Sequence, residues 1–262
     1  MKKTVVLLLL SMFFLQRGLA QDLEMYQRKV YVAKADSLPY RILYPENFDP
    51  AKKYPLVMVL HGAGERGNNN ESQLVYGATL FLEPQNRQQY PAIVVFPQCP
   101  KDSYWSNVNI VTDENGKRSF HYLQKSGEPT KAMKSLLGLL NELEKSGSVD
   151  KKQLYIGGLS MGGMGTFELL RRKPKKFAAA FPICGGGHPD GAKKYAKRVP
   201  LWVFHGEVDG VVPVEKSEVM VEAVQKAGGN VKFTVYPGVN HNSWDYAFKE
   251  PELLPWLFSH KK

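Results

Sequence analysis

Short apolar runs alternate with helix-like patterns along most of the chain. Residues 28–44 alternate apolar and polar positions, which predicts two antiparallel strands at the edge of a sheet. Six later runs are mostly apolar, as strands inside a helix-covered sheet are. These runs span residues 56–60, 92–96, 154–156, 177–183, 201–204 and 231–236.

Apolar residues at helical spacing follow several of these runs. The predicted helices cover residues 133–143, 164–170, 214–227 and 251–260. Strands that alternate with helices indicate an α/β fold with a mostly parallel central sheet flanked by helices. A chain of 262 residues, 43% of them hydrophobic, is long enough to build one substantial core. A single domain over residues 21–262 is therefore expected.

One long stretch, residues 101–130, has no apolar periodicity. A segment of that length between core elements is usually functional or mobile. Its aromatic residues suit the wall of a pocket, and Trp105 is among the residues assigned here to substrate binding. A surface hairpin is the competing interpretation, because a turn signal lies at residues 113–116.

The first 20 residues have the three parts of a secretory signal peptide. Two lysines precede the apolar run 5–15, and Gly18-Leu19-Ala20 forms a small-x-small cleavage site. The run is too short to span a bilayer, and no cysteine follows the site, so no stable membrane anchor is expected. The sequence predicts a secreted or periplasmic protein; an uncleaved N-terminal anchor helix is the alternative.

The chain is basic, with 35 Lys and Arg against 25 Asp and Glu and a formal net charge of +10. Proteins that bind nucleic acid gather such charge along one face or motif. Here the lysines are spread through predicted helices and loops, and no nucleic-acid-binding motif accompanies them. We expect a solvated basic surface and no nucleic-acid partner.

The chemistry centres on the G-x-S-x-G at residues 158–162, with Ser160 in the middle. A sharp turn between a strand and a helix strains its central residue and crowds the residues two before and two after it. Glycine fits both crowded places because it has no Cβ. The motif by itself also fits a glycine-rich turn, so the assignment depends on a base and an acid elsewhere.

A serine hydroxyl becomes a good nucleophile only beside a base that an acid orients. His241 lies in a loop directly after a predicted strand, whereas His205 ends a strand, where histidine more often packs than reacts. Glu207 and Asp209 are the candidate acids, and Asp209 sits at the turn after its strand. The order Ser160, Asp209, His241 is that of an α/β-hydrolase triad.

Four segments together resemble the secreted esterases of the α/β-hydrolase superfamily. They are L-H-G-A-G-E-R-G (60–67), G-L-S-M-G-G (158–163), H-G-E-V-D-G-V-V-P (205–213) and Y-P-G-V-N-H (236–241). The chain is similar to the group of poly(3-hydroxyalkanoate) depolymerases and feruloyl or acetylxylan esterases. It is more loosely similar to dienelactone hydrolases and prolyl oligopeptidase catalytic domains.

This resemblance implies a role for each matching residue. Ser160 would be the nucleophile, His241 the base and Asp209 the orienting acid, and the N–H groups of Met161 and Ala63 would form the oxyanion hole. No metal or cofactor is implied. The expected substrate is a small or polymer-linked carboxylic ester, such as a feruloyl or acetyl ester of a carbohydrate.

Two further features follow from the resemblance. Trp244 resembles an aromatic residue that lines the acyl or sugar pocket in some relatives. The superfamily strand order places the strands before Cys99 and Cys184 three spacings apart, or roughly 14 Å, beyond the reach of a disulfide. We therefore expect two unpaired thiols, with Cys184 beside His188 as a rival nucleophile.

Two other functions compete with ester hydrolysis. One is a serine peptidase of the prolyl oligopeptidase type, which usually carries a large second domain that this sequence does not indicate. The other is a non-catalytic binding protein on a hydrolase scaffold, which would have no reason to keep Ser, Asp and His together. The sequence predicts neither the natural substrate nor the oligomeric state.

Overall fold

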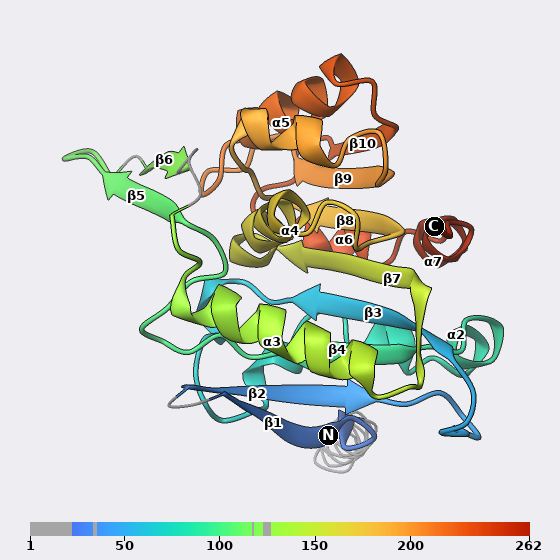
Figure 1. Ribbon diagram of the computed structural model, residues 1–262. Coiled ribbons are helices and arrows are strands. Elements are labelled where there is room, and N and C mark those ends of the chain that lie inside the picture. Colours follow the sequence, from blue (N-terminus) through green and yellow to red (C-terminus); the bar gives the residue numbers. More distant parts are fainter. Residues whose placement is uncertain (1–22, 34–35, 117, 123–126) are drawn as a thin grey trace, which may run out of the picture.

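The computed structural model describes residues 23–33, 36–116, 118–122 and 127–262. The predicted signal peptide lies outside the described residues. An eight-stranded sheet forms the centre of the molecule (Figure 1), with strand order β1-β2-β4-β3-β7-β8-β9-β10. The strands are β1 (Gln27–Ala33), β2 (Asp36–Leu43), β3 (Tyr54–Leu60), β4 (Ile93–Pro97), β7 (Val149–Leu159), β8 (Ala179–Ile183), β9 (Leu201–Gly206) and β10 (Val231–Tyr236).

The sheet is parallel except at one edge. Strand β1 pairs antiparallel with β2, and β2 pairs antiparallel with β4, while all pairs from β4 to β10 are parallel. The predicted edge hairpin and parallel core are therefore confirmed. Strand β7 is longer than predicted because Val149 pairs with Tyr54 across a register shift, which adds a polar segment before the apolar run.

Helices cover both faces of the sheet. They are α2 (Pro84–Gln89), α3 (Lys131–Lys145), α4 (Met161–Arg172), α5 (Glu215–Lys226), α6 (Trp244–Ala247) and α7 (Leu253–Phe258). Apolar residues of α3, α4 and α5 join one core cluster, and those of α6 and α7 join the cluster on the opposite face. In Figure 1, α3 and α4 lie in front of the strands. None of the helices described is both long and apolar enough to cross a bilayer.

Helix α3 illustrates how the local sequence forms these elements. The Thr130 side chain accepts a hydrogen bond from the Met133 N–H at 3.1 Å and so caps the first turn. Leu136 and Leu140, four residues apart, are both buried against the sheet. Gly147, at φ 88°, ends the helix because glycine adopts this conformation without strain.

The stretch 101–130 contains a hairpin of its own. Strands β5 (Val108–Thr112) and β6 (Arg118–Tyr122) form a separate two-stranded antiparallel sheet. Figure 1 shows this hairpin projecting beside the carboxyl ends of the parallel strands, where ligands bind in open α/β sheets. The stretch is therefore both a hairpin and part of a pocket wall, since Ile110, Arg118 and Phe120 of the hairpin line a pocket there.

Candidate active site

Ser160 lies at the turn between β7 and α4, in a strained backbone conformation. Its φ of 52° and ψ of −113° are outside the regions that non-glycine residues normally occupy. The Ser160 N–H donates to the Ile183 carbonyl of β8 at 2.9 Å, which holds the turn against the sheet. A Cβ on Gly158 or Gly162 would lie 2.6 or 2.0 Å from the Leu60 carbonyl oxygen. The predicted crowding of both glycines is confirmed.

The structure brings Ser160, His241 and Asp209 together. The His241 Nε2 lies 2.9 Å from the Ser160 Oγ, and its Nδ1 lies 2.7 Å from the Asp209 Oδ2. Asp209 follows β9 and His241 follows β10, so neighbouring strands deliver the acid and the base to one edge of the sheet. Glu207 is exposed and instead accepts the Gly238 N–H at 2.9 Å. The geometry therefore supports Asp209 as the acid.

Asp209 is buried and fully hydrogen-bonded. Its Oδ1 accepts the N–H groups of Val211 and Val212, both at 2.9 Å. Burial by itself raises the pKa of the Asp209 carboxyl, but hydrogen bonds from His205, His241 and Val212 outweigh it and hold this pKa well below its usual range. Asp209 is thus ionised at neutral pH, and it can stabilise an imidazolium at His241.

The two predicted oxyanion donors both begin helical segments. Met161 is the first residue of α4, and Ala63 is the first residue of a short 3₁₀ helix, Ala63–Glu65. Backbone N–H groups in the first turn of a helix have no acceptor within that helix. They are therefore free to donate to a substrate oxygen, and Ala63 lines the same pocket as Ser160. Their role as an oxyanion hole remains a prediction.

A pocket of about 260 Å³ opens beside the triad. Its walls are largely aromatic and apolar, and they combine residues 62–65 around Ala63 (the oxyanion loop), the β5–β6 hairpin and the loops after β9 and β10. The lining residues are Gly62, Ala63, Gly64, Glu65, Tyr76, Tyr104, Ile110, Arg118, Phe120, Leu159, Ser160, Met164, Val211, Val212, His241 and Trp244. The volume suits a small ester and its attached group.

The structure separates the two tryptophans assigned to substrate binding. Trp244 lines the pocket, and its ring packs edge-on against the His241 ring with centroids 5.2 Å apart. Trp105 is fully buried and does not line the pocket, so that prediction is wrong. It packs against His61 and so close to Gly165 that a Cβ there would lie 2.5 Å from the Trp105 Cβ. Its neighbour Tyr104 lines the pocket instead.

Two charged residues line the pocket that the sequence analysis did not assign to the site. Glu65 is the only carboxyl and Arg118 the only guanidinium among the described lining residues. Burial raises the pKa of the Glu65 carboxyl. Glu65 stands in the L-H-G-A-G-E-R-G segment, two residues after Ala63, and this position was a usable signal. Arg118 lies in the hairpin, where no motif marks it.

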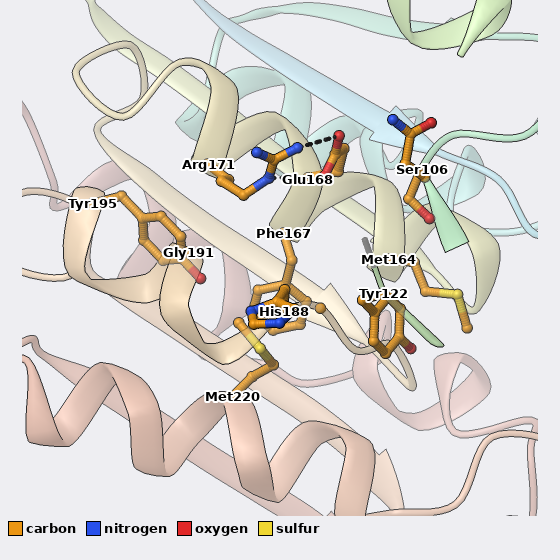
Figure 2. A pocket seen from close by; sticks show the side chains of 12 residues that line it. Ser106, Tyr122, Met164, Phe167, Glu168, Arg171, His188, Gly191, Tyr195 and Met220 are labelled. Atoms are coloured by element: carbon orange, nitrogen blue, oxygen red, sulfur yellow. Dashed lines mark hydrogen bonds and ion pairs between the residues drawn. The ribbon is translucent and has the colours of Figure 1, made fainter. Parts of the chain in front are cut away.

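A second, smaller cavity lies behind Met164, which lines both cavities. Figure 2 shows Tyr122, Tyr195 and Ser106 around it, together with the ion pair of Glu168 and Arg171. The three hydroxyls are buried and have no hydrogen-bond partner among the described residues. The free volume of about 10 Å³ fits one water molecule rather than a substrate. The larger pocket is therefore the candidate substrate site.

Both cysteines are buried and unpaired, as predicted. Strands β3 and β7 lie between the strands that precede them. Burial raises the pKa of the Cys99 thiol to about 12 and that of the Cys184 thiol further. His188 accepts the Asp190 N–H at 3.2 Å. Since a protonated, buried thiol is a poor nucleophile, the rival role of Cys184 is not supported.

One group of described residues has the geometry of a possible metal site. The ligand atoms of Cys184, Asp209 and His241 lie within 4.8 Å of one another. Both ring nitrogens of His241 already contact Ser160 and Asp209, however, and a metal ion needs the Cys184 thiolate. The same residues therefore fit proton transfer better than metal binding.

His61 ties the oxyanion loop to the neighbouring strand. It is 2% exposed, its Nδ1–H donates to the Gly62 carbonyl at 2.6 Å, and its Nε2 accepts the Cys99 N–H at 2.9 Å. Burial lowers the pKa of His61 from 6.5 to about 4. Protonation would place an Nε2–H donor opposite the Cys99 N–H donor, which is unfavourable, so the His61 ring stays neutral.

We expect His61 to make the fold sensitive to acid. Between pH 6.5 and about 4, the unfolded chain binds a proton at this histidine and the folded chain does not. Stability therefore falls as the pH is lowered through this window, by on the order of 3 kcal/mol in total. Urea unfolding at pH 7 and pH 4.5 measures it. His61→Gln, which does not titrate, should flatten the dependence; equal pH dependence in both proteins would contradict the prediction.

The fold and the triad define the class of protein as an α/β-hydrolase. The sheet order and the Ser–His–Asp arrangement at the carboxyl ends of its strands are typical of that class. A family model described as phospholipase/carboxylesterase matches residues 49–250. The chain therefore belongs to this family, and its family and fold are those of a carboxylic ester hydrolase.

Individual relatives agree with this family. A solved structure of a thermostable esterase is 35% identical, with a TM-score of 0.82, and the match covers 92% of this chain and 64% of that one. Acyl-protein thioesterase 1 of Neurospora crassa is 24% identical over 74% of this chain and 82% of that protein. A bifunctional acetylxylan esterase/xylanase, XynS20E of Neocallimastix patriciarum, is 34% identical over 30% of this chain and 12% of its own length.

Proposed function

We propose that this protein is a secreted serine esterase that cleaves small carboxylic esters, including acetyl and feruloyl esters carried on carbohydrate. The observation that carries the proposal is the hydrogen-bonded series Ser160–His241–Asp209, with distances of 2.9 and 2.7 Å, of which Ser160 and His241 line the pocket. The carbohydrate part is supported by the similarity to an acetylxylan esterase/xylanase and by the aromatic rings of Tyr76 and Trp244 beside polar Glu65.

The geometry indicates the course of the reaction. The Ser160 Oγ attacks the ester carbonyl carbon while the His241 Nε2 takes its proton. The tetrahedral oxyanion accepts hydrogen bonds from the Ala63 and Met161 N–H groups, each worth about 3 kcal/mol in related sites. The C–O bond then breaks, and His241 returns the proton to the departing alcohol. A water molecule, deprotonated by His241, releases the acid from Ser160 in the same way.

A substrate panel tests this function. The panel contains a nitrophenyl acetate, acetylated and feruloylated xylan oligosaccharides and a peptide amide. We expect turnover of the esters, with kcat/KM on at least one oligosaccharide ester above that on the nitrophenyl ester. Faster cleavage of the amide would favour a peptidase of the prolyl oligopeptidase type. Binding without turnover of any member would favour a non-catalytic protein.

Export is proposed from the sequence of residues 1–20 alone. Intact mass of the protein recovered outside the cytoplasm measures it, and we expect a chain that begins at Gln21. A recovered chain that keeps residues 1–20 would contradict cleavage, and a protein found in the cytoplasm alone would contradict the secreted location.

A further inference from the structure

A second histidine contacts the catalytic carboxylate from its buried side. His205, at the end of β9, is 0% exposed, and its Nε2 lies 3.2 Å from the Asp209 Oδ2. The same nitrogen lies 2.8 Å from the Val212 carbonyl oxygen. The His205 Nδ1 lies 2.7 Å from the Ser217 Oγ of α5. One oxygen of Asp209 is thus placed between two histidine rings.

The acceptors around His205 determine where its proton lies. The Nε2 faces a carbonyl oxygen and a carboxylate oxygen, and neither can donate. Nε2 must therefore carry a hydrogen, which lies between the Val212 carbonyl oxygen at 2.8 Å and the Asp209 Oδ2 at 3.2 Å. The Ser217 hydroxyl contacts the Nδ1 and also the Gly185 carbonyl at 2.9 Å, so the ring is anchored from α5 as well.

These contacts constrain how the Asp209 carboxylate can turn. The Val211 and Val212 N–H groups occupy Oδ1, while the His205 and His241 rings lie against Oδ2. Without the donor on the buried side, Oδ2 of this 6% exposed carboxylate would keep an unsatisfied lone pair. The carboxylate could then rotate to relieve it, and the hydrogen bond that orients His241 would weaken.

We propose that His205 is a positioning residue for the reaction: its Nε2–H, shared between the Val212 carbonyl and the Asp209 Oδ2, holds the carboxylate so that it keeps His241 aligned with Ser160. The proposal rests on the proposed function, because it concerns the same triad. It acts through Asp209 and needs no contact between His205 and the substrate.

Three substitutions at His205 separate positioning from packing. His205→Gln can place an amide nitrogen where the Nε2 lies and so keeps the donor. His205→Asn reaches only the Nδ1 position and loses it, while His205→Met fills similar space with no donor. We expect kcat to fall about 10- to 100-fold in the Met and Asn variants, with KM unchanged and kcat largely retained by Gln, as when an orienting hydrogen bond is removed.

The readouts are kcat and KM on nitrophenyl acetate, and the rate at which a fluorophosphonate labels Ser160. In labelling, a Ser160 Oγ–P bond forms, the P–F bond breaks and the serine proton leaves as HF by way of His241. Each substitution is also made in an Asp209→Ala background, where it should have no further effect on labelling. Circular dichroism and Tm measure whether each variant is folded. If the Met variant does not fold, the comparison of Gln with Asn still tests whether a donor at the Nε2 position is needed.

A failure of the His205 role can be distinguished from a failure of the proposed esterase function. Labelling that falls as expected while no ester is cleaved would support the role of His205 and overturn the proposed function. Equal loss of kcat or labelling in the Gln and Asn variants, or a full further loss in the Asp209→Ala background, would overturn the role of His205 and leave the esterase intact.

Discussion

Ser160→Ala is expected to lower kcat/KM on a short-chain nitrophenyl ester by about 10⁴- to 10⁶-fold. The substitution removes the hydroxyl that we propose as the nucleophile, and the residual rate would come from the proposed oxyanion donors and binding. The fold should persist, because the turn is held by the Ser160 backbone N–H and by the close approach of Gly162 to Leu60, and alanine keeps the Cβ. Steady-state kinetics and circular dichroism measure both effects.

Ser106→Ala is the matched control for this variant. Its hydroxyl is buried and lines the second cavity, not the pocket beside the triad. The control should keep the activity of the unmodified protein within a few-fold. Full activity of Ser160→Ala would overturn the nucleophile assignment and the reaction built on it.

Asp209→Asn is expected to lower kcat by about 10⁴-fold. The amide oxygen can still accept the Val211 and Val212 N–H groups, and this places the amide NH₂ where Oδ2 now lies. That NH₂ would face the Nδ1–H of His241, so the ring must adopt the other tautomer. His241 would then carry its hydrogen on Nε2, opposite Ser160, and could not take the serine proton.

Glu207→Gln tests the assignment of the acid with the same chemical change two residues away. Glu207 is exposed, and its contact is the Gly238 N–H at 2.9 Å, which a glutamine oxygen can keep. Activity within a few-fold of the unmodified protein is expected, measured on the same nitrophenyl ester. If Glu207→Gln is the inactive variant and Asp209→Asn retains activity, the acid is Glu207.

Local patterns in the sequence were sufficient to predict the fold class and most of the triad. Apolar runs such as residues 56–60 and 201–204 can only be buried between layers of helices, so they marked the parallel strands. Glycines 158 and 162 marked the turn, because no other residue fits so close to the Leu60 carbonyl. These features depend on a few neighbouring residues, which is why a linear sequence reveals them.

The pocket could not be assigned in the same way. Tyr104 and Trp105 are adjacent aromatic residues, and only the packing of Trp105 on Gly165 and His61 shows which of them is buried. Arg118 reaches the pocket because the β5–β6 hairpin projects beside the strand ends. Which side chain of a loop faces a cavity depends on contacts with residues far away in the sequence.

The sequence by itself determined the sheet of α/β type, the strained serine turn and the order of nucleophile, acid and base. The sequence already favoured Asp209 over Glu207 as the acid, and the tertiary structure supplies the contact behind that choice, because both carboxylates follow the same strand and just Asp209 reaches His241. Only the tertiary structure placed His205 behind that carboxylate. A hydrogen bond between side chains requires that both meet at about 3 Å, and this depends on how the strands and loops pack.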